Sequence, residues 1–218
     1  MNDHKFCFII CTDSERFYHE CEFYVSYLRI PEGYEAEIMP VHEASGMAAG
    51  YNSAMAATDA KYKIYIHQDT FILNPNFMED LLKIFASDEN IAMVGVRGTE
   101  HLSPDGVFWN SRMIGDLYRG EAGKEEYAAY SFDVAEGLTD AEYVDGLLIA
   151  TNRDLPWRED LFDGWWFFDM AQCFEFRRKG WRVVIPHQRI PWVAHEGGRR
   201  NLWGYDGYRQ IFMREYLE

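Results

Sequence analysis

The spacing of apolar positions along the first hundred residues predicts an alternation of strands and helices. Short, mostly apolar runs predict buried strands, and they lie at Phe6–Cys11, Glu35–Val41, Tyr62–Ile66 and Ile91–Val96. Between them, apolar residues recur at helical spacing, and start signals predict helices after Ser14, Gly46 and Pro75. Strands that alternate with helices of this length predict a parallel sheet.

The alternation stops between Gly98 and Thr139, a polar stretch rich in Gly and Glu. We expect an inserted loop region there, with a hairpin or a short helix. Beyond it the pattern predicts further strands at Glu142–Ala150, Trp181–Ile185 and Ile190–Ala194, and helices at Trp165–Lys179 and Trp203–Leu217. Gly180 is the expected C-cap of the first of these helices. The sequence therefore predicts one α/β domain over residues 1–218, with a mostly parallel central sheet flanked by helices.

Charge narrows the possible partners. The 36 acidic residues exceed the 21 Lys and Arg and give a net charge of −15, which excludes nucleic acid as an expected partner because phosphate backbones bind basic faces. Nine of the 21 basic residues lie between Arg177 and Arg214, and most are expected on the solvated surface. Without a membrane-spanning stretch, a leader-like start or a CxxC pair, we expect a cytoplasmic protein with no zinc site and no disulfide framework.

One carboxylate stands out by its position. Asp69 follows the apolar run Lys63–Ile66 in the stretch His67-Gln68-Asp69, and open α/β sheets bind their ligands just beyond such strand ends. A carboxylate there can hold Mg²⁺ or Mn²⁺ against a diphosphate, because these cations prefer hard oxygen ligands. The alternative is an Asp that only caps the following turn.

Two further polar signals fall at predicted element ends. Asp163 and Asp169 bracket an aromatic stretch, and His195 follows an apolar run; a plain turn, an exposed helix start and a structural histidine are the alternatives. Two carboxylates among four aromatic residues should be desolvated, which raises a carboxyl pKa, whereas a helix N-terminus lowers it, so we expect a modest net rise at Asp169. The Gly197-Gly198 pair allows hinge motion, and Arg199-Arg200 beyond it could contact phosphate oxygens.

These motifs together resemble the family 2 glycosyltransferases of GT-A fold, in particular a small bacterial branch related to a streptomycin-biosynthesis glycosyltransferase-like protein. The resemblance covers nearly the whole chain except residues 98–139. It is carried by blocks in matching order: Ala49-Gly50-Tyr51-Asn52 with Ala54, Tyr65 to Asp69, Val144-Asp145-Gly146, Phe162 to Trp165, Phe167-Phe168-Asp169, Gly180, and Val193-Ala194-His195.

The resemblance implies transfer of a sugar from a nucleotide-diphosphate sugar to an acceptor hydroxyl, usually with inversion, with Mn²⁺ or Mg²⁺ as cofactor. It implies a nucleotide-binding half at 1–97 and an acceptor and catalytic half at 140–218. Asp69 and His195 would hold the metal, Asp169 would be the general base with Asp163 as its support, and Asp145 would lie near the donor sugar or acceptor. The expected substrate-binding residues are Thr12, Asp13, Asn52, His67, Gln68, Trp165, Trp166, Arg199 and Arg200.

The motif also departs from the family pattern. The first acidic position of the metal motif is His67, and the acidic residue that many relatives carry after the second strand has only Glu43 as a counterpart. A catalytically weak or inactive nucleotide-sugar-binding domain is therefore the main alternative. A nucleotidyltransferase is a weaker one, since the loop Thr12-Asp13-Ser14-Glu15 lacks the glycines and basic charge that a triphosphate needs. A metal-dependent hydrolase has no HExxH-type cluster to support it.

Aromatic residues gather in the second half of the chain. Trp165, Trp166, Trp192 and Trp203 lie near the expected base and His195 in sequence. Aromatic faces suit the apolar faces of sugar rings, although a tryptophan-rich core is the commoner explanation. The donor sugar, the base of the nucleotide, the acceptor and the oligomeric state are left open.

Overall fold

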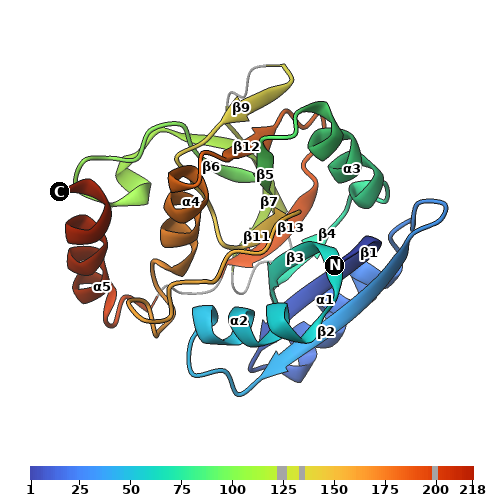
Figure 1. Ribbon diagram of the computed structural model, residues 1–218, viewed down its shortest axis with the longest axis horizontal. Helices are drawn as coiled ribbons and strands as arrows, with labels where there is room; N and C mark the ends of the chain where they lie inside the picture. Colours follow the sequence, from blue (N-terminus) through green and yellow to red (C-terminus); the bar gives the residue numbers. More distant parts are fainter. Residues whose placement is uncertain (122–126, 133–135, 198–200) are drawn as a thin grey trace.

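The computed structural model describes residues 1–121, 127–132, 136–197 and 201–218, with the backbone alone for residues 121 and 127–132. Its central sheet has seven strands in the order β2-β1-β3-β11-β5-β12-β9 (Figure 1). Their bounds are β1 Asn2–Thr12, β2 Glu35–His42, β3 Ala60–His67, β5 Ile91–Gly95, β9 Leu138–Asp140, β11 Leu148–Thr151 and β12 Arg182–Pro186.

Most strands of this sheet run in one direction. β1 pairs in parallel with β2 and β3, and β12 pairs in parallel with β5. β11 is inserted antiparallel between β3 and β5, which leaves β5 running in the same direction as β3, and β9 closes the edge antiparallel to β12. The predicted α/β fold with a mostly parallel sheet is therefore confirmed, with two reversed strands.

Helices cover both faces of this sheet. They are α1 Glu15–Ser26, α2 Met47–Ala57, α3 Phe77–Ser87, α4 Phe168–Arg178 and α5 Tyr205–Phe212. Along β1, Cys7, Ile9 and Cys11 belong to a core shared with α2 and α4, while the alternate residues pack against α1 and α3. Because successive side chains point to opposite faces, a strand covered on both faces is apolar throughout. That explains the uninterrupted run Phe6–Cys11.

A second sheet occupies the region where the regular pattern stopped. Its order is β10-β6-β7-β13-β4, with β8 paired to β7. The bounds are β4 Thr70–Ile72, β6 Arg97–Thr99, β7 Met113–Glu121, β8 Tyr127–Phe132, β10 Tyr143–Val144 and β13 Val193–Gly197. The expected hairpin is β7–β8, and a short 3₁₀ helix, η1, spans Phe108–Asn110. Among the described residues of this stretch, β7 pairs with the distant β13, a pairing that the sequence did not indicate.

Several predicted boundaries were wrong, and the strand expected at Glu142–Ala150 is divided into β10 and β11, which belong to different sheets. The helix expected from Trp165 begins only at Phe168, because Phe167 has a left-handed backbone with φ of 65°. The strand expected at Ile190–Ala194 begins at Val193, so His195 lies inside β13 and not beyond its end. In the C-terminal segment, α5 is followed by a π-helical turn, η2, at Met213–Leu217.

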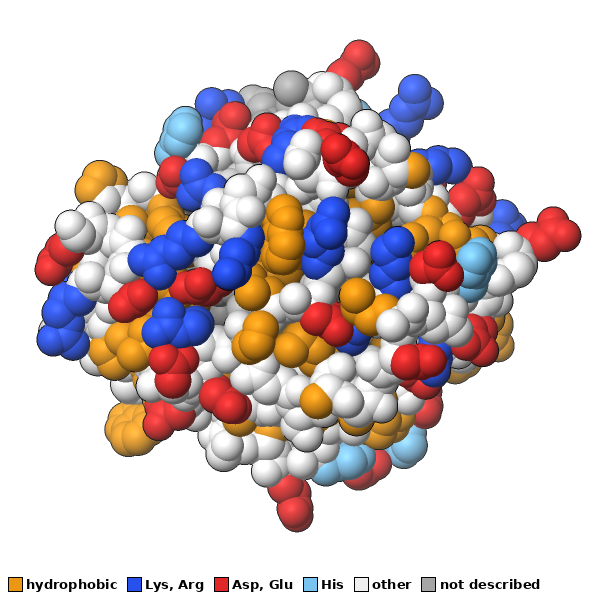
Figure 2. Space-filling model, in the orientation of Figure 1, with side chains coloured by type: hydrophobic (Ala, Val, Ile, Leu, Met, Phe, Trp, Pro, Cys, Tyr) orange, Lys and Arg blue, Asp and Glu red, His pale blue; other side chains and the backbone are white. Residues whose placement is uncertain are grey.

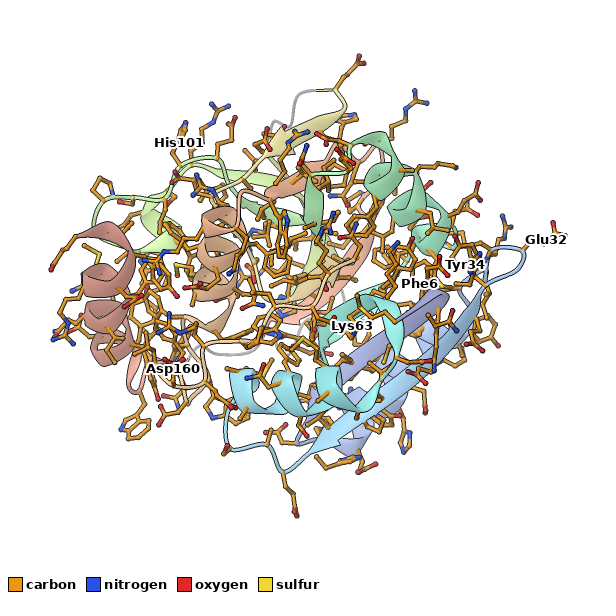
Figure 3. The ribbon with its side chains drawn as sticks, viewed as in Figure 1. Phe6, Glu32, Tyr34, Lys63, His101 and Asp160 are labelled. Carbon is orange, nitrogen blue, oxygen red and sulfur yellow. The ribbon has the colours of Figure 1, made fainter. Side chains whose placement is uncertain are left out.

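Several charged side chains form ion pairs at the surface. Figure 2 shows Lys and Arg interspersed with Asp and Glu over one face. Arg178 meets Glu215 at 3.0 Å and Arg182 meets Asp88 at 2.8 Å, as expected for the C-terminal basic residues. One cation is internal: Lys63, labelled in Figure 3, is fully buried and pairs with Asp154 at 2.7 Å. No helix among the described residues is long and apolar enough to cross a membrane.

Candidate active site

A pocket of about 920 Å³ opens where the parallel strands end. Thr12 of β1 lies beside His42 of β2, and Cys11 lies beside His67 of β3. Parallel strands bring their carboxyl ends to one edge, so residues far apart in sequence share this pocket. Its lining comprises Cys11, Thr12, Asp13, Glu15, Val41, His42, Glu43, Ala44, Met47, His67, Gln68, Asp69, Trp165, Trp166, Phe168, Asn201 and Trp203.

Three side chains at this edge form a cluster suited to a metal ion. Ligand atoms of His67, Asp69 and His195 all lie within 4.8 Å of one another, and His195 Nε2 is 3.4 Å from Asp69 Oδ1. The second sheet brings the distant histidine into place. His195 pairs with Thr70 across β13 and β4, and the Glu196 amide donates to the Asp69 carbonyl at 2.9 Å.

Electrostatics prepares this cluster for a cation. Burial lowers the pKa of the His67 imidazole, so it is neutral near pH 7 and keeps a nitrogen lone pair free for coordination. Burial alone would raise the pKa of the Asp69 carboxyl. The hydrogen bond and charge of His195, together with His67, outweigh burial and hold that pKa below its ordinary value. Asp69 is therefore an anion over the neutral range.

Gln68, between the two ligand candidates, is used by the protein itself. Its carbonyl oxygen accepts hydrogen bonds from the Thr12 hydroxyl at 2.6 Å and from the Asp13 and Ser14 amides at 3.1 Å each. Its amide nitrogen donates to Asp13 Oδ1 at 2.5 Å. This side chain thus fixes the β1–α1 loop, where the nucleoside was expected. It also links that loop to the cluster of candidate metal ligands.

Asp169 is a buried acid at the start of α4. Its Oδ2 accepts hydrogen bonds from the Tyr143 hydroxyl and the Gly146 amide, both at 3.0 Å. Burial, and then the charge of Asp145, raise the pKa of Asp169 from 3.8 to about 6, against the opposing effect of these hydrogen bonds. The rise agrees with the sequence expectation. Asp145 is itself accessible at 18% and lies 3.6 Å from Arg97.

Asp163 belongs to a different contact. Its Oδ1 accepts a hydrogen bond of 2.6 Å from the Tyr208 hydroxyl of α5. The hydrogen bonds that Asp169 receives come from Tyr143, Gly146 and Met170. Asp163 therefore links the segment before α4 to α5 instead of bonding to the expected base. Trp165 and Trp166 both line the pocket.

Other expected residues lie elsewhere. Both polar atoms of the Asn52 amide bond to the backbone of Trp157, at 2.9 and 2.8 Å, and Asn52 is outside the pocket lining. That amide therefore holds α2 against the segment between β11 and α4, and its polar atoms are taken up by this contact. Arg199 and Arg200 fall outside the described residues, so their expected contact with phosphate stays a prediction.

Some residues of the site were not singled out from the sequence. Tyr143, fully buried, donates to Asp169, but a lone tyrosine two positions before Asp145 gives no signal of that role. His67 was expected to contact substrate, yet it joins Asp69 and His195. Its spacing of two residues from Asp69 at a strand end could have indicated a shared ligand set.

A second cleft, of about 710 Å³, lies between α3 and the loop before β13. Its lining is mainly apolar, with Asp80, Lys83, His187 and Arg189 as its ionisable members. It includes none of the strand-end residues described above, so the candidate chemistry belongs to the first pocket.

Comparison with known proteins agrees with this geometry. The sequence profile of the Glycosyltransferase like family matches residues 7–216, so the chain belongs to that family. A comparison with functionally curated proteins finds no match.

Solved structures show the same fold. The mannosyltransferase PcManGT from Pyrobaculum calidifontis, in complex with GDP-Man and Mn²⁺, superposes with a TM-score of 0.62 at 13% identity, over 98% of this chain and 64% of that one. Residues 1–349 of S. aureus TarS give a TM-score of 0.54 at 10% identity, over 88% and 60%. The same TarS fragment with UDP-GlcNAc gives 0.52 at 10%, over 90% and 59%. The chain thus has the fold of GT-A glycosyltransferases and spans about 60% of these longer chains.

Proposed function

We propose that this protein transfers a sugar from a nucleotide-diphosphate sugar to an acceptor hydroxyl, with the help of a divalent metal ion and with inversion at the anomeric carbon. The observation that carries the proposal is the cluster of His67, Asp69 and His195 beside the pocket at the strand ends. Within its family, the motif blocks favour the small branch related to the streptomycin-biosynthesis protein.

The donor set fits a divalent ion. Asp69 offers an anionic oxygen, and His67 and His195 offer imidazole nitrogens, which favours Mn²⁺ over Mg²⁺ because magnesium prefers oxygen ligands alone. A bound ion would neutralise the charge of the leaving diphosphate as a Lewis acid. An acidic protein needs such a charge at this point, since four carboxylates (Asp13, Glu15, Glu43 and Asp69) line the pocket and would repel a diphosphate.

Asp169 is the proposed base. With a pKa of about 6, its carboxyl is mostly ionised at pH 7 and still basic enough to take a proton from an acceptor hydroxyl. The hydrogen bonds from Tyr143 and Gly146 occupy both lone pairs of Oδ2, whereas Oδ1 accepts one hydrogen bond, from the Met170 amide, and keeps a lone pair for a proton. Asp145, more accessible than Asp169, would contact the donor sugar or the acceptor.

The nucleotide would lie in the half formed by residues 1–97. Thr12 ends β1 and Asp13 begins the loop that Gln68 fixes, while His42 ends the neighbouring strand β2 and Glu43 follows it. We propose Arg199 and Arg200 for the diphosphate. Relatives that share the fold bind different donors, GDP-Man in one case and UDP-GlcNAc in another, so both nucleotides are candidates.

A thermal-shift panel tests the proposal. UDP-, GDP-, dTDP- and CMP-sugars are each added with Mn²⁺ or with EDTA, because a ligand that binds only the native state raises the melting temperature. We expect a metal-dependent rise with at least one sugar nucleotide. Consumption of that donor, even slowly with water as acceptor, then separates a transferase from a binding domain. A panel with no metal-dependent shift would refute the proposal.

A further inference from the structure

Two tryptophans on the wall of the candidate active site are exposed to solvent. Trp203 is 87% exposed and Trp165 is 55% exposed, and both line the pocket that contains Asp69. Trp157, by contrast, is 2% exposed and belongs to the core. A large indole left in water forgoes the free energy of burial, so two of them on one pocket wall indicate a surface that a ligand covers.

The two tryptophans are held together by one tyrosine. Gly164, which precedes Trp165, lies so close to Tyr208 that a Cβ there would be 2.6 Å from its hydroxyl oxygen. Gly204, which follows Trp203, has φ of 77°, and its Cβ would be 3.6 Å from the same ring. The hydrogen bond from Tyr208 to Asp163 locks this arrangement. The two turns that carry the exposed indoles are therefore fixed against each other.

The remaining tryptophan of this segment has a supporting role. The Trp166 ring meets the Tyr205 ring edge-on, with centroids 5.1 Å apart and an interplanar angle of 87°. It packs against the core of α4 and α5. Trp166 lines the pocket as well, but the exposed indoles are Trp165 and Trp203, which we call the tryptophan pair.

The chemistry of the wall selects a class of ligand. A pyranose ring presents an apolar face of C–H groups that stacks on an aromatic ring, while its hydroxyls at the rim can donate to acidic oxygens. The carboxylates of the same pocket repel anions. The tryptophan pair also comes from the half of the chain that carries Asp169, whereas Thr12, Asp13 and His42 occupy the strand ends expected for the nucleoside.

We propose that the tryptophan pair is the acceptor subsite and that the acceptor is an uncharged saccharide that stacks on Trp165 and Trp203. This inference rests on the proposed glycosyl transfer, and names the acceptor class for it. In this proposal, Asp163 is a positioning residue that acts on the acceptor subsite through Tyr208.

Saturation-transfer NMR with defined sugars tests the subsite. The probes are cellobiose, lactose, maltose and N,N′-diacetylchitobiose, with sialyllactose as the anionic counterpart of lactose. Mg²⁺ replaces paramagnetic Mn²⁺, and the nucleoside diphosphate that gave the largest thermal shift is present. We expect saturation of ring C–H protons in at least one neutral disaccharide and a weaker signal for sialyllactose than for lactose. Absence of any neutral disaccharide signal would overturn the proposal.

Variants then assign the signal to the pair. Trp165→Ala and Trp203→Ala should each weaken disaccharide binding by roughly 3- to 10-fold, and Trp203→Phe should retain most of it, as expected for loss of an aromatic contact. Tyr27→Ala is the matched control, because Tyr27 is 71% exposed and outside the pocket lining. Circular dichroism checks that each variant is folded, and the 87% exposed Trp203 is the safer of the two positions.

Nucleotide binding separates this inference from the proposed function. The tryptophan variants should keep the metal-dependent thermal shift of the nucleoside diphosphate. If they lose that shift as strongly as they lose the sugar, the pair belongs to the donor and the acceptor proposal is wrong. If the wild-type protein shows no metal-dependent shift at all, the proposed function itself fails, whatever the disaccharides do.

Discussion

The two sides of the candidate active site differ in how their polar groups are stabilised. On the strand-end side, Gln68 joins Thr12, Asp13 and Ser14 in a network in which its carbonyl oxygen accepts three hydrogen bonds. On the α4 side, Asp169 lies buried next to Asp145 and the aromatic residues around it. On the strand-end side, the polar groups around Gln68 are hydrogen-bonded within the protein. On the α4 side, burial makes the ionised form of Asp169 unfavourable.

The contrast fits a division between binding and chemistry. A satisfied network stabilises the folded chain and presents a rigid surface, whereas a buried carboxyl with a raised pKa costs stability and gains basicity. A left-handed backbone adds local strain on both sides, at Phe167 (φ 65°), two residues before Asp169, and at Glu43 (φ 54°) in the pocket lining on the strand-end side. The cost of ionising the buried Asp169 carboxyl is therefore what distinguishes the α4 side.

The largest effect is expected at the metal cluster. Asp69→Ala and His195→Ala each remove one of three candidate ligands, so binding of nucleoside diphosphate with Mn²⁺ should weaken by at least roughly 10²-fold. Titration calorimetry measures it, and EDTA should have the same effect on the wild type. Asp160→Ala is the control, since Asp160 is exposed and pairs with Arg158. Equal affinity with and without metal would contradict the role.

Asp169→Asn tests the proposed base on the α4 side directly. Turnover should fall by at least roughly 10²-fold, while nucleotide binding stays within about twofold, a difference of under 1 kcal/mol. In the wild type, turnover should rise as pH increases through about 6 and then level off, as the carboxyl ionises. Near-normal transfer by this variant would move the base to another carboxylate, with Asp145 the first candidate.

The same variant should also gain stability. A carboxyl whose pKa is raised in the folded state binds its proton more tightly there, so the wild type loses stability as pH rises from 3.8 to about 6. Asparagine does not ionise, which removes a cost of up to ~3 kcal/mol at pH 7, at 1.36 kcal/mol per pKa unit. Its amide nitrogen also replaces an oxygen that accepts a backbone N–H, from Gly146 or Met170, and this lost hydrogen bond offsets part of the gain at every pH. Urea denaturation at pH 4 and pH 7 measures the effect, and the variant should gain stability relative to the wild type between the two pH values.

Gln68→Ala tests the hydrogen-bond network on the strand-end side. Removing the carbonyl that holds the β1–α1 loop should weaken nucleotide binding by roughly 10-fold, the worth of one or two net hydrogen bonds. Affinity for Mn²⁺ alone should be unchanged, because His67 and Asp69 keep their side chains. Gln210→Ala, at an exposed position of α5, is the control. Loss of metal binding in Gln68→Ala would mean that the two sides are not separable.

The smallest effect is a shift of the pH profile. Asp145→Asn removes a negative charge that raises the pKa of Asp169, so the acidic limb of the rate profile should move down by up to roughly one pH unit. Turnover measured from pH 4.5 to 8 detects it. An unmoved limb would show that the titrating group is not Asp169.

Much of the strand-end side could be predicted from the sequence. The run Phe6–Cys11, the following polar loop and the stretch ending in Asp69 are local patterns, and parallel strands bring their ends together by rule. The α4 side depends on contacts that no local pattern encodes. Phe167 delays the start of α4 through an unusual backbone angle, and Tyr143 reaches Asp169 only because β10 packs against α4.

The second sheet was the least predictable part. β7 lies in a stretch of weak periodicity, and its pairing with β13 joins segments separated by more than seventy residues. Periodicity reports which face of an element is buried but not its partner. The prediction that His195 and Asp69 meet came from the family pattern and not from periodicity. The strand that brings them together was misplaced by three residues.

The pairing of β4 with β13 has a consequence for how the protein folds. More than half of the chain lies between Asp69 and His195. The cluster of candidate metal ligands therefore exists only after the two ends of this long segment have come together. Early intermediates and truncated chains that lack β13 would have no complete cluster. Uptake of the ion would then report that β4 and β13 have paired, and it would stabilise this pairing against local unfolding.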